Sequence, residues 1–267
     1  SFKNTRIYLS IDDNWRNGTN AYCWANLISI GHKEDYDSVD LIAHEYTHGV
    51  ESTISNLKYE GESGALAEAY SDIFGELTEG YVNQKDPNWI HVPKTTNRNV
   101  KNPKESRNPD AYNGENWEST VPTFDADGHS TNDNGHVHKN STVISHAAYL
   151  MWNGIDGNES KKIDANNLAK IWYKSFFLLQ SDANFEQCAN AVLLAAKHMM
   201  VDGLLTQEQY NCVSEAFNNV NISTSSLVKS VPNGSKVRAT DYLGEDLKNY
   251  YLKITTTTHI LWKEKTS

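Results

Sequence analysis

Two histidines, His44 and His48, stand four positions apart in the segment "HEYTHGV", and Glu45 directly follows the first of them. On an α-helix, residues i and i+4 project from the same face, so both imidazole rings can reach one metal ion. Glu45 lies beside this pair and can act on a water molecule held at the ion. A catalytic zinc ion takes three protein ligands and keeps one position open. The segment therefore indicates two-thirds of a catalytic zinc site.

A third ligand is available in the next apolar segment, "SGALAEAYSDIFGELTE", which contains Glu68 twenty residues after His48. The neighbours of Glu68 are mostly small or apolar, and an acidic side chain buried among them needs a charged partner. Asp72 follows one helical turn later and can hydrogen-bond the outer nitrogen of a ligating histidine. We therefore predict that His44, His48 and Glu68 bind zinc.

Hydrophobic periodicity outlines the helices that must position these residues. Ser38 is a predicted N-cap for a helix whose apolar residues recur at helical spacing up to Ile54. The polar residues 80–137, rich in Asn, Asp, Gly and Pro, predict long surface loops. Short β-like runs occur within residues 1–36. Further helices are predicted at 63–79 and at about 140–153, 164–180, 184–202 and 206–218.

These patterns predict an α+β fold in three parts. Residues 1–60 form a small N-terminal β/α part that includes the histidine-bearing helix, and residues 61–221 form a mainly α-helical subdomain. Beyond Val220, β-branched and aromatic residues alternate between turn signals such as Pro-Asn-Gly. Residues 222–267 are therefore expected to be a β-rich appendage or part of an extra module.

The composition narrows the class of partners. The chain has 267 residues with 24 basic and 34 acidic side chains, a net charge of -10, which disfavours nucleic acid. No apolar run reaches the roughly 20 residues that span a bilayer. Three cysteines without a CxxC pair argue against a disulfide framework or thiolate zinc binding, although one bridge stays open. The chain begins at Ser1 without a signal peptide, so we expect a piece of a longer product.

Three segments, "HEYTHGV", "YEGESGALAEAYSDIFGEL" and "NDNGHVHKNS", resemble the thermolysin family of zinc endopeptidases. The resemblance runs from about Asn20 to Val220. It implies a thermolysin-like fold whose active-site cleft lies between the N-terminal part and the helical subdomain. It also implies a secreted, monomeric protein that acts on proteins or peptides, while the net charge and the short apolar runs predict no nucleic-acid or membrane partner.

The resemblance implies catalytic roles by position. His44, His48 and Glu68 match the zinc ligands, and Asp72 matches an outer aspartate. Glu45 matches the general base. Tyr59 and His138 match two residues that stabilise the oxyanion of the reaction, and Asp133 matches the carboxylate that orients this histidine. Asn140, near the start of a predicted helix, offers a capping role as the alternative account of the segment around His138.

The resemblance also implies substrate-binding residues. Arg98 matches an arginine that binds a substrate carbonyl group. Asn20 and Ala21 match edge-strand residues that hold the substrate backbone by strand addition.

Several positions depart from the family pattern. Ala67 stands where the family commonly has an asparagine that supports a ligand histidine. Asp40 and Glu79 match two residues of a paired calcium site, but its other positions carry Asn88, Ile90 and Val92 or Pro93. Calcium takes several oxygen ligands, so we expect this site to be reduced or lost. The segment "DADGHSTND", with Asp125 and Asp127, is either a substitute calcium loop or a solvated acidic loop.

The leading hypothesis is a zinc-dependent endopeptidase that hydrolyses internal peptide bonds next to apolar residues. A zinc-activated water would attack the carbonyl group, with Glu45 as general base. The expected cofactor is Zn²⁺, and Ca²⁺ at a reduced number of sites is a second candidate. The alternative is a catalytically silent zinc- or peptide-binding module on the same fold. A third option, an aminopeptidase, is disfavoured by the ligand spacing and by the lack of a Gly-x-Met-x-Asn motif.

Overall fold

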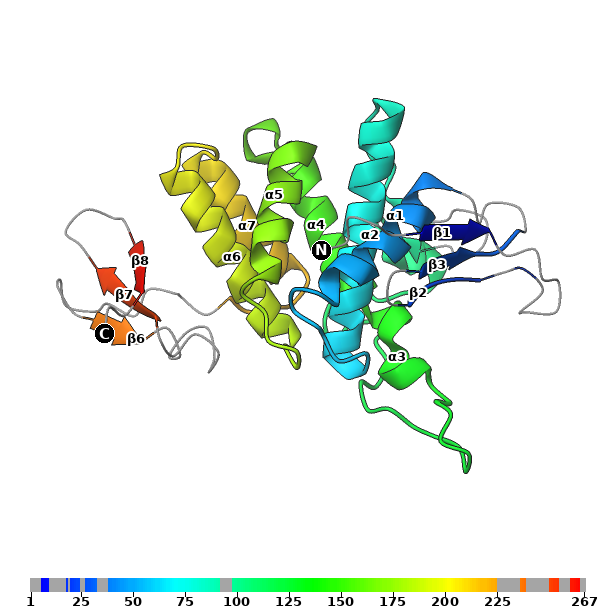
Figure 1. Ribbon diagram of the computed structural model, residues 1–267. Coiled ribbons are helices and arrows are strands. Elements are labelled where there is room, and N and C mark those ends of the chain that lie inside the picture. Colours follow the sequence, from blue (N-terminus) through cyan, green and yellow to red (C-terminus); the bar gives the residue numbers. More distant parts are fainter. Residues whose placement is uncertain are drawn as a thin grey trace.

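The computed structural model describes residues 18, 20–24, 27–32, 38–91 and 98–224, and the backbone of 6–9, 236–238, 250–254 and 260–264. Figure 1 shows the helices and strands in chain order. The α-helices are α1 (Val39–Glu51), α2 (Gly61–Asn83), α3 (Asp133–Asn140), α4 (Thr142–Asn153), α5 (Ala165–Phe176), α6 (Phe185–Val201) and α7 (Gln207–Asn219). Short 3-10 helices are η2 (Pro103–Ser106), η3 (Ile155–Gly157) and η4 (Glu159–Lys161).

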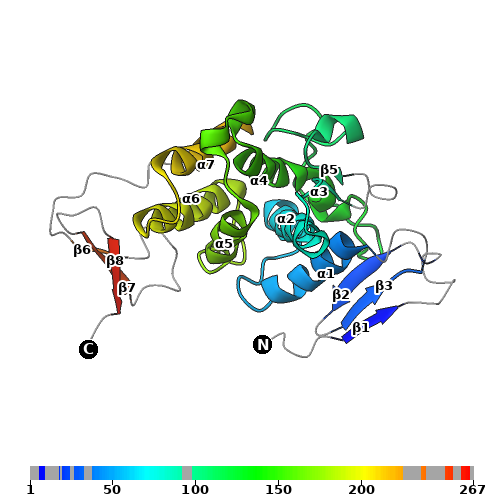
Figure 2. The same cartoon turned by 90° about the horizontal axis from the view of Figure 1, so that it is seen from above.

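Helix α2 lies at the centre of the helical body, where it contacts α1, α3, α4, α5 and α6 (Figure 2). It is buried on nearly all sides from Gly61 to Gly80. Small residues in this stretch, including Ala65, Ala67 and Ala69, let the neighbouring helices approach closely. A helix enclosed in this way holds Glu68, Asp72 and Glu76 away from water.

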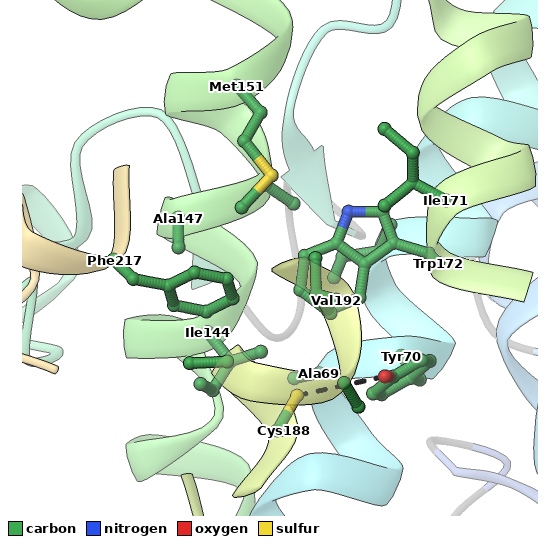
Figure 3. Packing of buried hydrophobic residues seen from close by; sticks show 14 of the residues in the cluster. Ala69, Tyr70, Ile144, Ala147, Met151, Ile171, Trp172, Cys188, Val192 and Phe217 are labelled. Atoms are coloured by element: carbon green, nitrogen blue, oxygen red, sulfur yellow. Dashed lines mark hydrogen bonds between the residues drawn. The ribbon is translucent and has the colours of Figure 1, made fainter. Parts of the chain in front are cut away.

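The main core joins α2 to α4, α5, α6 and α7 (Figure 3). The rings of Tyr70 and Trp172 meet edge to face with centroids 5.1 Å apart. The Tyr70 hydroxyl lies 2.6 Å from Ser175 Oγ and 3.7 Å from Cys188 Sγ, so its polar end is satisfied inside the core. Cys188 and Cys212 are buried and Cys23 is half-buried, and no disulfide bond joins these three described cysteines.

A three-stranded sheet packs beside α1. Strand β3 (Leu27–Ile30) lies between β1 (Arg6–Leu9), which is parallel to it, and β2 (Ala21–Trp24), which is antiparallel to it. Ile28 and Ile30 pack with Leu41 of α1 in a small second core. Strand β2 is therefore an edge strand held against the histidine-bearing helix.

Two further small sheets complete the described structure. Strands β4 (Ile90–His91) and β5 (Arg98–Asn99) pair antiparallel. Strands β6 (Lys236–Arg238), β7 (Tyr250–Ile254) and β8 (Ile260–Glu264) form an antiparallel sheet in the order β6-β7-β8. The three-part division at residues 60 and 221 stays a prediction. Among the described residues, no helix combines the length and the apolar character that a membrane crossing requires.

The predicted helices are confirmed, with differences in detail. Helix α2 continues past 79 to Asn83, so the long loop begins later than expected. That loop also contains β4, β5 and η2, because short pairings of this kind leave no hydrophobic period to detect. Ser38 occupies the N-cap of α1, but its side chain makes no capping hydrogen bond. Asn140 does not cap a helix, because its side chain bonds the backbone of Glu118.

Gly75 sets the distance between α1 and α2. A Cβ atom at this position would lie 2.7 Å from the carbonyl oxygen of Asp40. We expect Gly75→Ala to lower the free energy of unfolding by about 1–3 kcal/mol, because overpacking outweighs the roughly 1 kcal/mol gained in helix propensity. Urea unfolding measures this. Val82→Ala on the exposed end of α2 is the control, and a Gly75→Ala chain as stable as the wild type would contradict the close approach.

Candidate active site

Helices α1 and α2 bring the three predicted zinc ligands together. The Nε2 atoms of His44 and His48 lie 3.1 Å apart, as i, i+4 geometry predicts. Glu68 Oε2 lies 3.4 Å from His44 Nε2, and Glu68 Oε1 lies 3.2 Å from His48 Nε2. His44 and Glu68 are buried, and His48 is partly exposed.

The spacing of these atoms fits zinc. Ligand atoms about 2.0–2.1 Å from a zinc ion at tetrahedral angles are about 3.3 Å from one another. The separations of 3.1, 3.2 and 3.4 Å between the two Nε2 atoms and the Glu68 oxygens match that value. Glu68 Oε2 is also fully buried and accepts no hydrogen bond from a described residue. A cation among these atoms would compensate the buried carboxylate.

Asp72 lies directly behind His44. Its Oδ1 is 2.9 Å from His44 Nδ1, which leaves His44 Nε2 directed at His48 and Glu68. These three residues are called the ligand set below. The Arg98 guanidinium donates from Nε to Asp72 Oδ2 at 2.8 Å and from Nη2 to Oδ1 at 2.7 Å. This bidentate pair fixes the carboxylate, and the carboxylate fixes the ring of His44.

The electrostatics of the cluster favour positive charge at the ligand set. Burial lowers the pKa of His44, but the neighbouring carboxylates of Asp72 and Glu68 outweigh it and raise the pKa to about 10. Burial raises the pKa of Glu68, but His138 and His48 hold it well below its usual range. Two carboxylates thus remain ionised in the interior and stabilise a proton, or a metal ion in its place.

Glu45 follows His44 on α1 and is 5% exposed. Among the described residues, none donates a hydrogen bond to its carboxylate, which is therefore not committed to a structural role. Burial, followed by the charge of Glu45, raises the pKa of the Cys23 thiol to about 11, which places Glu45 near strand β2. The Glu45 side chain thus lies near Cys23 of β2, on the helix that carries His44 and His48.

Tyr59 and His138 approach Glu68 from loops and helices outside α1. The Tyr59 hydroxyl donates a short hydrogen bond to Glu68 Oε1 and lies 3.4 Å from His138 Nε2. His138 Nε2 is 3.3 Å from Glu68 Oε2. Tyr59 is 43% exposed, so the two polar groups lie where the ligand set meets solvent.

Asp133 orients His138. Its Oδ1 lies 2.9 Å from His138 Nδ1, and its Oδ2 accepts a hydrogen bond from the His138 backbone N–H at 3.0 Å. Partial desolvation of the ring lowers the pKa of His138, but Glu68 and Asp133 outweigh it and raise the pKa above its usual value. The ring is thus held in one orientation and favoured as a cation.

The segment that carries Asp133 has unusual backbone geometry. Asp133, Asn134, Gly135 and His136 all have positive φ, between 51° and 91°. A Cβ atom at Gly135 would lie 2.4 Å from the carbonyl oxygen of Thr120, so only glycine fits there. Such a run is costly, and it persists here where it turns the Asp133 carboxylate back onto His138. The resemblance predicts that Asp133 orients His138, whereas the composition of the "NDNG" segment predicts only a loop.

Asn20 and Ala21 lie at the start of edge strand β2. Ala21 pairs with Ile30 of β3, and Asn20 O accepts a hydrogen bond from Gly31 N at 2.8 Å. The opposite edge of β2 has no partner strand among the described residues. Backbone groups on this edge can pair with an added peptide strand.

Among the described residues, Asp40 and Glu79, which are predicted to bind calcium, do not fall in one group of three candidate ligands. Asp40 is buried and lies beside Glu76 and His91. One potential ligand atom from each of the three residues lies within 4.8 Å of the other two. Glu79 instead accepts a hydrogen bond from Asn88 Nδ2 at 2.7 Å. Val92 and Pro93 lie outside the described residues, and the calcium assignment stays a prediction.

Glu76 and His91 were missed in the sequence. Glu76 continues the i, i+4 series of Glu68 and Asp72 along one face of α2, which was the available signal. Burial, followed by Asp40, raises the pKa of Glu76 well above its usual range. Burial lowers the pKa of His91 to about 3, so its ring is neutral. The ring stacks on His44 with centroids 4.8 Å apart.

The acidic loop around Asp125 and Asp127 is exposed. Asp125 Oδ1 accepts backbone hydrogen bonds from Asp127 at 3.0 Å and from His129 at 2.8 Å. This carboxylate therefore already organises its own turn.

Comparison with known proteins identifies the family of the chain. The family described as "Thermolysin metallopeptidase, alpha-helical domain" matches residues 55–222. The thermostable neutral protease NprT of Geobacillus stearothermophilus is 34% identical over 195 residues, which cover 69% of this chain and 33% of that protein. Bacillolysin of Bacillus cereus is 36% identical over 170 residues, which cover 59% of this chain and 28% of that protein.

The fold has a counterpart among solved structures. The precursor of protealysin, a metalloproteinase from Serratia proteamaculans, matches with a TM-score of 0.53 and 19% identity, over 77% of this chain and 66% of that one. The chain belongs to the thermolysin family of metallopeptidases. It spans about a third of the length of the curated relatives it matches.

Proposed function

We propose that the protein is a zinc-dependent endopeptidase that hydrolyses internal peptide bonds. The observation that carries the proposal is the convergence of His44 Nε2, His48 Nε2 and the Glu68 carboxylate at 3.1–3.4 Å. The membership of the thermolysin family supports the same reaction class. Zinc, when bound by these three residues, would supply Lewis-acid catalysis for attack by water on a carbonyl group.

Glu45 is the proposed general base. Its carboxylate is adjacent to the ligand set and carries no hydrogen bond from a described residue, so it can accept a proton from the attacking water. The same carboxyl group can then give the proton to the departing amine. Burial near β2 keeps this exchange away from bulk solvent.

His138 and Tyr59 are the proposed donors to the oxyanion. Both lie at the exposed margin of the ligand set, where the carbonyl oxygen of a substrate would develop negative charge. The raised pKa of His138 favours its cationic form. A cation at this position stabilises the negative charge that develops on the substrate oxygen only in the transition state. Asp133 acts through His138 by holding its ring in place.

Arg98 and strand β2 are the proposed contacts with the substrate chain. Arg98 uses Nε and Nη2 on Asp72, which leaves Nη1 for a substrate carbonyl group. Asn20 and Ala21 lie on the unpaired edge that can add a peptide strand. A preference for apolar residues beside the cleaved bond, secretion and a monomeric state follow from the family resemblance and complete the proposal.

The experiment that tests the proposal measures turnover of an internally quenched peptide that is blocked at both ends and contains apolar residues. We expect the zinc-loaded chain to cleave it internally, a chelator to abolish cleavage, and added zinc to restore it. Mass spectrometry of the products identifies the bond. The alternative, a silent binding module on the same fold, predicts zinc or peptide binding without products, and that result would overturn the proposal.

A further inference from the structure

A second group of metal-binding side chains lies beside the proposed zinc site. Asp40 comes from α1, Glu76 from α2 and His91 from β4, and each offers one ligand atom within 4.8 Å of the other two. All three side chains are buried. Three separate elements therefore direct a nitrogen and two carboxylates at one point in the interior.

Glu76 is the residue that most needs a cation. Its Oε2 accepts a hydrogen bond from the Trp89 backbone N–H at 2.7 Å. Its Oε1 is fully buried and accepts no hydrogen bond from any described residue. The charged groups that act on it most strongly are two other carboxylates, Asp40 and Glu79. A buried carboxylate in such surroundings is stabilised by a proton or by a metal ion.

We propose that Asp40, Glu76 and His91 bind a second divalent transition-metal ion, of which zinc is the representative. An imidazole nitrogen with two carboxylate oxygens suits zinc and its neighbours. Calcium takes six to eight oxygen ligands, and an imidazole nitrogen is not among them. The second ion is thus of a different chemical class from the calcium expected of Asp40 and Glu79.

The orientation of His91 fits this role. Its Nδ1 lies 3.4 Å from Asp40 Oδ2, and its Nε2 lies 3.5 Å from Asp72 Oδ1. Binding a metal through Nδ1 leaves the Nε2 proton directed at Asp72, an arrangement common to metal-binding histidines. Asp72 also lies 2.9 Å from His44 Nδ1. One carboxylate would therefore orient a histidine of each site, and the two sites share this support.

The test counts metal ions by mass spectrometry after the metal-free full chain is dialysed against buffered zinc. We expect two zinc ions per wild-type chain and one in Glu76→Gln or His91→Gln, whose folding is checked by circular dichroism. Glu79→Gln is the matched control, because its carboxylate is near Asp40 but bonds Asn88, and it should keep two. Excess calcium should not displace the second zinc.

The result is independent of peptidase activity. The Glu68→Gln variant should lose the ion of the first site and keep the ion of the second site, which Glu76→Gln removes. If Glu76→Gln and His91→Gln both bound as many zinc ions as the wild type, the proposal would be overturned. A protonated Glu76 would then account for the cluster. Displacement of the second ion by calcium would overturn the assignment to a transition metal.

Discussion

Replacing Glu45 with glutamine is expected to lower kcat/KM by about 10²–10⁴-fold, the range attributed to general acid–base catalysis. The zinc content should not change, because Glu45 is outside the ligand set formed by His44, His48 and Glu68. Glutamine preserves the size of the side chain but cannot take up a proton at neutral pH. The loss should therefore fall on kcat, with little change in KM.

The control for this variant is Glu51→Gln, a buried glutamate on the same helix. The Glu51 carboxylate accepts hydrogen bonds from Leu57 N at 2.5 Å and from Ser55 Oγ at 3.2 Å. It holds the segment after α1 and does not take part in the proposed chemistry. Assay of the quenched peptide with both variants, alongside zinc content, separates the roles. Equal activity of Glu45→Gln and wild type would contradict a general base at this position.

The sequence predicted the helices and the first ligand set because both depend on regular spacing. A helix fixes the angle between residues four apart, so His44 and His48 had to converge wherever that helix formed. Glu68 and Asp72 obeyed the same rule on α2. Their distance from α1 could not be derived from either helix, because it depends on close packing at Gly75 and Asp40.

The parts that escaped prediction depend on irregular backbone. The pairing of Asp133 with His138 was expected from the family resemblance, but the four left-handed residues at 133–136 that make it were not, because no periodic pattern encodes such a run. Strand β4 has two residues, too few to show alternation, so the burial of His91 was hidden. Arg98 was matched to substrate binding, while its two bonds to Asp72 arise from a tertiary contact between β5 and α2.

Replacing Glu68 with glutamine is expected to remove zinc from the first site and, with it, all detectable peptidase activity. Glutamine keeps an oxygen for the Tyr59 hydroxyl but loses the negative charge that offsets the ion. The neutral amide also places an N–H₂ group near two ring nitrogens. We expect a fall in zinc affinity larger than the roughly 10–100-fold that follows loss of an outer hydrogen bond.

Asp72→Asn provides the matched comparison, because it weakens the support of His44 without removing a ligand. Zinc titration monitored by thermal unfolding measures both variants, since an ion that binds only the folded chain raises its stability in proportion to the logarithm of its concentration. Making each substitution in a Glu76→Gln background, which is expected to lack the second ion, isolates the first site. If Glu68→Gln in that background bound zinc as tightly as Glu76→Gln alone, Glu68 would not be a ligand. The third ligand of the first site would then have to be a residue other than Glu68.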